Sequence, residues 1–441
     1  MFKSQKPVGG LEDTIENKNY IKKKKGINKN FPTEGCYINR SMKKIRVLRI
    51  LNRFNVGGPV YNATYLTKYL NTELYETLLI GGKPEKHEQS ADYILNNLNV
   101  SFRQLKYMRR SISPLLDFIS LVQIVIIIYK YKPDIIHTHA AKSGLLGRLA
   151  TLFYFKKVRV IHTYHGNVFE GYFPWYVTKV LLALERFLAM KSTKIVAISK
   201  LQKRDLVDKY KICGDEKIVV IPLGFDLKRF TENSLLKRVN IRKSMNVKED
   251  TILITIIGRI VPIKNHQLFV DVIKYCKDKS SRSIKALVVG DGNETERLID
   301  YVMDKELSYS YKELSADCDV LLTSWRSDID SILAGSDIVC LTSINEGTPV
   351  SIIESMASET ASISTNVGGV ADIIENNVSG IVCSNDINDY AENLCRIIED
   401  DNLRARLAKN GKSVSLDNYN YGKLVFNIEA LYSNLIEENE K

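Results

Sequence analysis

Short segments rich in β-branched residues alternate with longer helical patterns along the chain from residue 44 onward. Such alternation predicts βαβ units, which build parallel sheets covered by helices. The 441 residues are too many for one ordinary hydrophobic core, so we expect two domains of about 200 residues each. The sequence therefore predicts an α/β fold with two parallel sheets.

The expected strands fall into two groups, one in each half of the chain. They are 45–53, 77–80, 135–139, 159–164, 194–199 and 219–222, followed by 251–258, 286–290, 320–323, 338–342, 361–365 and 380–383. Helical patterns cover 61–70, 144–155, 174–190 and, at the end of the chain, 419–437. The apolar run 115–129 is shorter than the roughly 20 residues that a membrane span needs, so we interpret it as a buried helix that leads into a strand.

Charge divides the chain at about residue 235. Residues 43–235 carry a net charge of +16, whereas residues 236–441 carry −9. We therefore expect one domain over 43–235 and a second over 236–415, followed by a C-terminal helix in 416–441. Residues 1–42 have no periodic apolar pattern and a net charge of +5, which predicts a disordered basic leader. Both Met1 and Met42 stay open as natural starts.

Composition narrows the class of protein. The chain is 44% hydrophobic and 26% charged, as expected of a soluble globular protein. Its seven cysteines are scattered without metal-site spacing, which favours a reducing cytoplasm. The basic first half could face phosphates or an anionic membrane; an unevenly charged solvated surface is the alternative. A nucleic-acid-binding protein is a further alternative, although no nucleic-acid motif supports it.

The first half carries two kinds of motif at predicted strand ends. Gly57 and Gly58 follow the first strand, where glycines allow a backbone to approach an anion and a helix N-terminus attracts it. Four of the six histidines lie at two further strand ends, in 137–139 and 162–165. We expect three of these four to be buried structural residues. A zinc site made of all four is an alternative without a recognisable ligand spacing.

The second half places cations and glycines after its strands. Arg259 follows a strand end, and Lys264 comes five residues later. Arginine can hold phosphate oxygens with two hydrogen bonds while lysine acts as a point charge, so the pair suits a departing diphosphate. Gly290 and Gly292 follow the next strand. They predict either close approach by a base or ribose, or an ordinary turn.

The most specific motif is a pair of glutamates eight residues apart, Glu346 and Glu354. Carboxylates accept hydrogen bonds from hydroxyls, so the pair suits a polyhydroxylated ligand. Glu346 is expected in a loop and Glu354 near the start of the next helix. Backbone amides between them would suit a phosphate; the residues concerned are Gly347, Thr348, Pro349 and Val350.

Together these motifs resemble glycosyltransferase family four, whose members have the two-domain GT-B fold. The resemblance covers the chain from about residue 44 to residue 435. The stretches 137–148, 162–166 and 169–173 resemble members that build bacterial surface polysaccharides. The resemblance implies a retaining transfer from a nucleotide sugar, with UDP as the favoured nucleotide and no metal or other cofactor. It also implies that the C-terminal helix crosses back to the first domain.

The resemblance assigns roles to individual residues. Arg259 and Lys264 would hold the donor diphosphate, with Gly57, Gly58, Gly290 and Gly292 completing the donor site. Glu346 would bind the donor sugar together with Gly347, Thr348, Pro349 and Val350, while Glu354 would bind the ribose. His165 matches the family's active-site histidine beside the donor sugar. The run 356–361 departs from the family, which has Gly and Pro after the Met-Ala pair, and this puts the local turn in doubt.

The acceptor side is less specific in sequence. We expect a lipid-linked saccharide acceptor and a peripheral attachment to the cytoplasmic face of the inner membrane, made by cations of the first half. The aromatic run 169–176 could contact the lipid-linked sugar, or belong to the core. A nucleotide-sugar epimerase of the same fold is the enzymatic alternative. The residues expected on the acceptor or membrane side are His139, Lys142, Lys106, Arg109 and Arg110.

Overall fold

The computed structural model describes residues 43–85, 88–109, 111–166 and 174–437. The predicted leader 1–42, Arg110 and most of the aromatic run 169–176 lie outside these residues. Lys44–Lys441 forms one compact unit. The fold described below is that of this unit.

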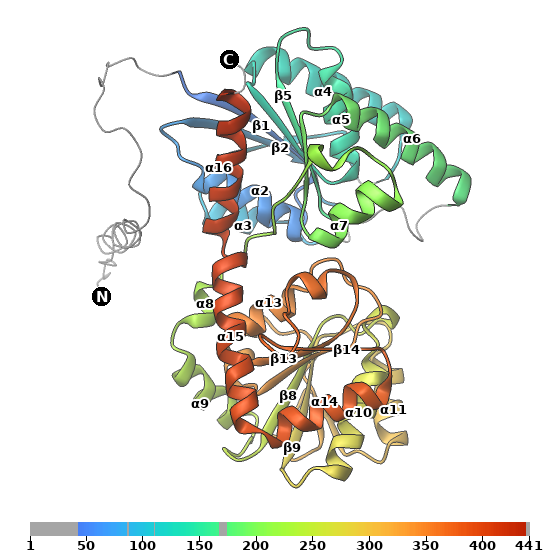
Figure 1. The fold of residues 1–441 in the computed structure, drawn as a ribbon, viewed down its shortest axis with the longest axis vertical. Helices are drawn as coiled ribbons and strands as arrows, with labels where there is room; N and C mark the ends of the chain where they lie inside the picture. The colour runs from blue at the N-terminus through green and yellow to red at the C-terminus, as the bar shows by residue number, and fades with distance from the viewer. Residues whose placement is uncertain (1–42, 86–87, 110, 167–173, 438–441) are drawn as a thin grey trace, which may run out of the picture. The chain divides into compact units, whose positions relative to one another are not determined.

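Two seven-stranded parallel sheets form the framework, as the alternating sequence pattern predicts (Figure 1). The first sheet has the order β3-β2-β1-β4-β5-β6-β7 and the second β10-β11-β9-β8-β12-β13-β14. The first consists of β1 (Ile45–Arg53), β2 (Tyr75–Gly82), β3 (Phe102–Leu105), β4 (Ile135–His139), β5 (Arg159–Tyr164), β6 (Lys194–Ala197) and β7 (Ile218–Val220). The second consists of β8 (Ile252–Ile257), β9 (Ile284–Val289), β10 (Tyr309–Tyr311), β11 (Val320–Leu322), β12 (Ile338–Leu341), β13 (Ala361–Thr365) and β14 (Ile381–Cys383).

Helices connect the strands and cover both faces of each sheet. In the first half they are α2 (Gly58–Tyr69), α3 (Asp92–Asn97), α4 (Pro114–Tyr131), α5 (Ala141–Thr151), α6 (Trp175–Lys191) and α7 (Lys200–Arg204), with the shorter η1 (Asp205–Lys209) and η2 (Asp215–Lys217). In the second half they are α8 (Lys228–Thr231), α9 (Ser234–Ser244), η3 (Pro262–Lys264), α10 (His266–Lys279), α11 (Thr295–Asp304), α12 (Ile329–Gly335), α13 (Val350–Ala357), η4 (Gly368–Asp372), α14 (Ile387–Glu399), α15 (Asp401–Tyr419) and α16 (Tyr421–Glu437).

The last helix, α16, belongs to the core of the first sheet. Its apolar face, with Leu424, Ile428 and Tyr432, packs in one buried cluster with Val47 and Ile135. Figure 1 shows α16 in red beside the blue elements of the first sheet. The chain therefore returns to its first sheet after completing the second.

The second core begins before the predicted boundary at residue 236. Leu227 and Phe230, around α8, are buried in a cluster with Val339 and Ile352 of the second half. The predicted boundary is too late because it was placed in the polar segment after residue 231. The chain enters the second core before that segment, at Leu227 and Phe230.

Helix α4 corrects the interpretation of the apolar run 115–129 as a buried helix. One face packs on the first sheet through Ile124, Ile127 and Ile128, but Leu115 and Phe118 are 71% and 62% exposed. Among the described helices, α4 alone is long and apolar enough to cross a membrane by length and composition. Since it packs along the sheet, it lies on the surface of the domain. Sequence alone could not separate its two faces because both are apolar.

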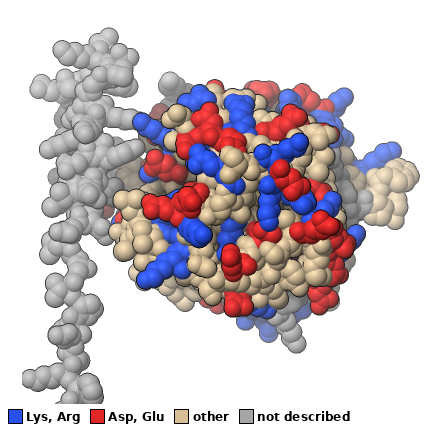
Figure 2. Space-filling view, turned by 90° about the horizontal axis from the view of Figure 1, so that it is seen from below, with Lys and Arg blue, Asp and Glu red and all other residues tan. Residues whose placement is uncertain are grey.

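Charged side chains are mixed on the face of the molecule drawn in Figure 2, where Lys and Arg alternate with Asp and Glu. No block of one sign covers this face. This face therefore lacks the continuous basic surface that nucleic-acid binding would require.

Candidate active site

The expected site residues follow strands at which the order of each sheet reverses. In the first sheet, β1 lies between β2 and β4; in the second, β8 lies between β9 and β12. Loops diverge at such points and leave a crevice at the carboxyl ends of the strands. Gly57 and Gly58 follow β1, Arg259 and Lys264 follow β8, and Glu346 follows β12. The sheet topology thus explains why these positions are exposed to a ligand.

Lys264 and Glu346 join the loops after β8 and β12. Lys264 Nζ lies 2.5 Å from Glu346 Oε1, and Ser343 Oγ donates a 2.6 Å hydrogen bond to the same oxygen. The backbones are tied as well, since the Ile344 amide donates to the Ile263 carbonyl at 2.9 Å. The predicted phosphate-binding lysine and sugar-binding carboxylate are therefore neighbours. Arg259 is exposed on the same loop.

The glycines of the candidate site fall into two groups, which differ in the physical reason for having glycine at the position. A Cβ on Gly290 would lie 1.9 Å from the Gly258 carbonyl oxygen, and one on Gly292 would lie 2.0 Å from that of Ile260. These two glycines let the loop after β9 pack against the loop after β8, so internal packing already explains them. A Cβ on Gly57 or Gly58 would meet nothing closer than 3.9 Å, an ordinary van der Waals contact, and one on Gly347 would meet nothing within 4 Å, so only Gly347 borders open space.

The loop before α13 offers free amides. The amides of Gly347 and Thr348 donate no hydrogen bond to any residue that the structure describes. Pro349 has no N–H to give, which corrects its inclusion among the expected amide donors. The segment with Gly368 and Gly369 packs against this loop, since the Gly369 amide donates to the Gly347 carbonyl at 3.1 Å.

Glu354 lies in α13 and faces a cation that sequence analysis missed. Arg229 Nη2 of α8 lies 3.8 Å from Glu354 Oε1, and about a fifth of the Glu354 side chain is exposed. Burial raises the pKa of Glu354 to about 7, against the opposing effect of Arg229. Arg229 was missed because α8 is a four-residue helix between the two sheets, without a recognisable pattern of its own.

The raised pKa of Glu354 predicts a pH-dependent cost to stability. Its carboxyl binds a proton more tightly in the folded chain than at its ordinary value of 4.5, so this residue destabilises the fold progressively as pH rises from about 4.5 to about 7. We expect Glu354→Gln to stabilise the fold more at pH 8 than at pH 5. The increase in the free energy of unfolding should be about 2–3 kcal/mol larger at pH 8 than at pH 5. Urea unfolding of both proteins at the two pH values measures this; an equal effect at both would contradict it.

One face of the first sheet gathers three histidines around a buried arginine. Parallel register pairs Arg49 of β1 with His137 of β4 and His139 with Thr163 of β5. Side chains alternate between faces along a strand, so these residues share the face covered by α16. Arg49 Nη1 lies 3.3 Å from both His137 Nδ1 and His139 Nε2. His139 Nδ1 lies 3.0 Å from His165 Nε2, just after β5.

The fourth histidine, His162, lies on the opposite face. Its Nδ1 is 2.9 Å from Thr138 Oγ1, and a Cβ on Gly144 would lie 2.3 Å from its ring. The four histidines therefore do not form one cluster. The Arg49 guanidinium, which cannot lose its charge, also lies among the other three, and both facts argue against the zinc alternative.

Three of the four histidines are fully buried, as expected; they are His137, His139 and His162. Their hydrogen-bond partners are side chains, whereas backbone partners were expected. His139 cannot meet an acceptor or a membrane directly, which corrects that expectation. Lys142 is mostly buried, with Nζ 2.5 Å from Asp117 Oδ1. Only Lys106 and Arg109 of the expected acceptor-side cations are seen exposed.

Comparison with known proteins decides the family. Residues 56–229 match the model for Glycosyltransferase Family 4, and residues 237–414 match that for Glycosyl transferases group 1. The chain is 30% identical over 348 residues to an Escherichia coli protein named UDP-Gal:alpha-D-GlcNAc-diphosphoundecaprenol alpha-1,3-galactosyltransferase, covering 78% of this chain and 86% of that one. This chain belongs to glycosyltransferase family four. It is a glycosyltransferase.

Other family members and solved structures agree. The chain is 28% identical to the capsular polysaccharide biosynthesis glycosyltransferase CapM of Staphylococcus aureus, over 76% of this chain and 85% of that protein. The structure of Anabaena HepE in complex with UDP shares the fold, with a TM-score of 0.73 and 18% identity over 88% of this chain and all of that one. A glycosyltransferase from Rickettsia africae gives 0.72, with 22% identity over 89% and 99%.

The departure from the family pattern after α13 leaves the turn intact. Glu359 takes the left-handed conformation, with φ of 59°, at the end of the helix. Its amide donates to the Met356 carbonyl at 3.0 Å. Glycine is the usual residue in this conformation, so this chain forms the turn with a less favourable residue.

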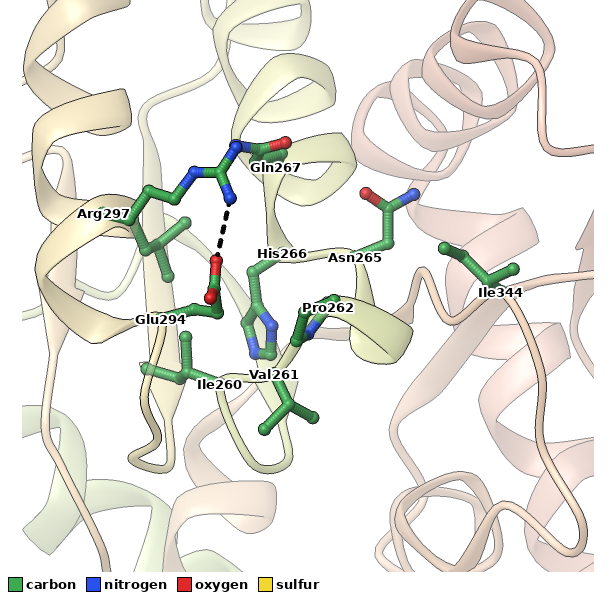
Figure 3. Close-up of a pocket in the computed structure, with 10 residues that line it drawn as sticks. Ile260, Val261, Pro262, Asn265, His266, Gln267, Glu294, Arg297 and Ile344 are labelled. Atoms are coloured by element: carbon green, nitrogen blue, oxygen red, sulfur yellow. Dashed lines mark hydrogen bonds and ion pairs between the residues drawn. The ribbon is translucent and has the colours of Figure 1, made fainter. Parts of the chain in front are cut away.

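The pocket in Figure 3 lies beside the loop after β8. Its lining includes Ile260, Asn265, His266, Arg297 and Ile344, with about 210 Å³ of space. It contains none of Arg259, Lys264, Glu346 and Glu354. Arg297 pairs with Glu294 across its wall.

Proposed function

We propose that this glycosyltransferase moves a sugar, with retention of configuration, from a UDP-sugar to a hydroxyl of a lipid-linked saccharide in the synthesis of a surface polysaccharide. The observation that carries the proposal is the 2.5 Å pair of Lys264 and Glu346. It places a cation for phosphate beside a carboxylate for sugar hydroxyls, with the amides of Gly347 and Thr348 next to them.

In this proposal the donor binds mainly to the second half. Lys264 and Arg259 hold the diphosphate, Glu346 holds sugar hydroxyls, and Glu354 accepts a hydrogen bond from the ribose. Gly57 and Gly58 let the diphosphate approach the backbone at the start of α2. Tyr61, on the same helix, lies close enough to Arg229 and Glu354 for both charges to shift its pKa.

The reaction needs no protein nucleophile. The bond from the anomeric carbon to the phosphate oxygen breaks, the acceptor oxygen attacks from the same face, and the acceptor proton passes to the departing phosphate. The charge that grows on the diphosphate is stabilised by Lys264 and Arg259. Glu346 is engaged by Lys264 and Ser343, which supports a binding role for it. Trapping a covalent glycosyl-enzyme would overturn this mechanism.

Calorimetric titration with UDP and UDP-sugars tests the donor site. At pH 8, where most of Glu354 is ionised, we expect wild type to bind UDP and Glu354→Ala to bind it at least about tenfold more weakly, since a charged hydrogen bond contributes roughly 1.5–3 kcal/mol. Glu359→Ala is the matched control, because this exposed glutamate five residues later pairs with Lys412. Equal affinities of wild type and Glu354→Ala would refute the assignment of Glu354, and absence of binding to UDP would refute the nucleotide.

The names of the two relatives support the acceptor. The Escherichia coli relative acts, by its name, on a sugar carried by diphosphoundecaprenol, and the Staphylococcus aureus relative serves capsular polysaccharide biosynthesis. An acceptor carried by such a lipid remains in a membrane. The enzyme must therefore work at a membrane surface, which we propose is the cytoplasmic face of the inner membrane.

The exposed face of α4 supports that attachment. Its outward residues recur three or four positions apart, which forms a single stripe along a helix; they are Leu115, Phe118, Val122, Ile126 and Tyr129. Tyr129 donates a hydrogen bond to the Phe153 carbonyl, and this joins the stripe to exposed Phe153 and to Phe155, which is 90% exposed. We call these seven residues the α4 patch.

Cations border the α4 patch, as anionic lipid would require. Lys130, Lys132, Lys156 and Lys157 are exposed at its edge. An apolar stripe bordered by lysines is the pattern of a helix that lies in a membrane interface. The expected cation Lys106 is exposed as well, but the apolar α4 patch supports attachment more directly than the cations first considered.

Vesicle co-sedimentation tests the α4 patch. We expect wild type to bind vesicles that contain anionic lipid, and the double variant Phe118→Asp/Ile126→Asp to lose most of this binding because two apolar anchors become charged. Leu236→Asp/Val239→Asp is the matched control, since both residues are exposed on α9, outside the patch. Equal binding by the two double variants would refute the role of α4, and failure of wild type to bind at low salt would refute the attachment itself.

A further inference from the structure

The buried Arg49 has no role in the functions assigned so far. It lies in the middle of β1, fully buried, where central strands of a parallel sheet are otherwise apolar. An isolated buried charge is costly unless it forms hydrogen bonds. Its guanidinium faces the ring nitrogens of His137 and His139, both at 3.3 Å, and it also interacts with the Tyr432 hydroxyl.

A guanidinium can only donate hydrogen bonds, so each imidazole nitrogen that faces it must carry a lone pair. For His139 that nitrogen is Nε2. Burial holds the pKa of His139 well below its usual range, so the ring is neutral and its single proton is on Nδ1. This Nδ1–H points at His165 Nε2, 3.0 Å away.

The same reasoning then fixes the proton of His165. Its Nε2 accepts from His139, and burial lowers the pKa of His165 to about 3, so its one proton is on Nδ1. That nitrogen is buried and has no hydrogen-bond partner among the residues that the structure describes. It is a donor left free at the carboxyl end of β5, where the proposed donor sugar would lie.

We infer that Arg49 is a positioning residue which, through His139, holds His165 as the neutral tautomer with its proton on Nδ1. This inference rests on the proposed function for the position of the sugar, but not for the tautomer. His165 then offers a hydrogen bond to an oxygen of the donor sugar without introducing a positive charge beside it. The opposite tautomer would present a lone pair to that oxygen.

His137 belongs to a separate branch of the same network. Its Nδ1 lies 2.6 Å from the Tyr432 hydroxyl, and its Nε2 lies 2.7 Å from Thr163 Oγ1. The Tyr432 hydroxyl also interacts with Arg49, but none of these contacts involves His139 or His165, and the Arg49 cation stays in place without it. Removing the Tyr432 hydroxyl should therefore leave the tautomer of His165 unchanged, whereas removing the Arg49 cation should not.

Nuclear magnetic resonance of the full chain, labelled with ¹⁵N in histidine, reads the tautomer directly. His165→Gln assigns the signal by its loss. We expect the proton of His165 on Nδ1 in wild type, a mixture or the opposite tautomer in Arg49→Met, and the wild-type state in Arg49→Lys, because lysine also only donates. Tyr432→Phe and Arg103→Met, which changes an exposed arginine on β3, should keep the wild-type state.

Kinetics with the donor sugar give the second readout. Loss of a partner that orients a metal-binding histidine typically costs about 10–100-fold. By analogy we expect a loss of this order in kcat for Arg49→Met, with little change in KM and recovery in Arg49→Lys. A proton on Nε2 in wild type, or an unchanged tautomer in Arg49→Met, would overturn the inference. If Arg49→Met does not fold, a proton on Nε2 in wild type or a changed tautomer in Arg49→Lys would still overturn the inference. Failure to bind UDP would refute the proposed function without affecting the tautomer result.

Discussion

Lys264→Ala should slow sugar transfer by about 100–1000-fold, since removing one preorganised group that stabilises developing charge typically costs this much. Lys264 is the charge closest to Glu346 in the donor site, at 2.5 Å. Its effect should appear mainly in kcat, because the negative charge of the diphosphate grows as the bond to the sugar breaks. Initial rates at saturating donor measure it.

The matched control is Lys274→Ala. Lys274 lies on α10 of the same domain and pairs with Asp278 one helical turn away, so its loss should leave kcat within about twofold of wild type, as is usual for exposed helix pairs. If Lys264→Ala retained more than a tenth of the wild-type kcat, Lys264 would not be the main stabiliser of the leaving diphosphate. Circular dichroism of both variants verifies that the fold is kept.

Arg148→Met should lower the free energy of unfolding by about 3–5 kcal/mol, the usual cost of leaving a buried charge without its partner. Arg148 is fully buried, and its Nη2 lies 2.7 Å from Glu185 Oε2. The Tyr164 hydroxyl donates to the same oxygen at 2.6 Å. Without the guanidinium, the Glu185 carboxylate would remain between α5 and α6 with one donor. Urea unfolding measures the loss.

Two further variants show whether the buried charge is the cause. Adding Glu185→Gln to Arg148→Met removes the unpaired carboxylate and should restore part of the stability. Lys203→Met breaks an ion pair whose aspartate, Asp215, is 73% exposed, and should cost less than about 1 kcal/mol. A loss of under 1 kcal/mol in Arg148→Met would contradict the prediction.

The pattern of the sequence predicts most of the fold but not its edges. β1, β4, β5 and β13 have the predicted bounds because each concentrates β-branched residues between clear breaks. β3 and β10 were missed; they are short strands at the edges of their sheets, with exposed residues among their few positions. Their sequences lack the β-branched residues on which the prediction depended.

The residues of the candidate site could be predicted where a single loop contains a complete sequence motif. Lys264 and Glu346 come from two such loops, and their shared place at the reversal of strand order follows from topology. Arg49 was missed because its partners are 88 and 90 residues away. A signal existed, since a lone arginine between Leu48 and Ile50 in a central strand needs a buried partner. Only strand register identifies that partner.

The place of α16 in the first sheet has a consequence for how the protein is made. A ribosome releases residues 44–220 long before it synthesises α16, and during that interval Val47, Leu66, Ile135 and Ile161 lack the apolar surface that later covers them. The first domain therefore cannot finish folding as it emerges, although domains generally fold in order of synthesis. Tyr432, which bonds His137, is synthesised only after all the strands of the second sheet. Premature termination within α16 would thus yield a protein whose second domain can be complete while its first still exposes an open apolar face.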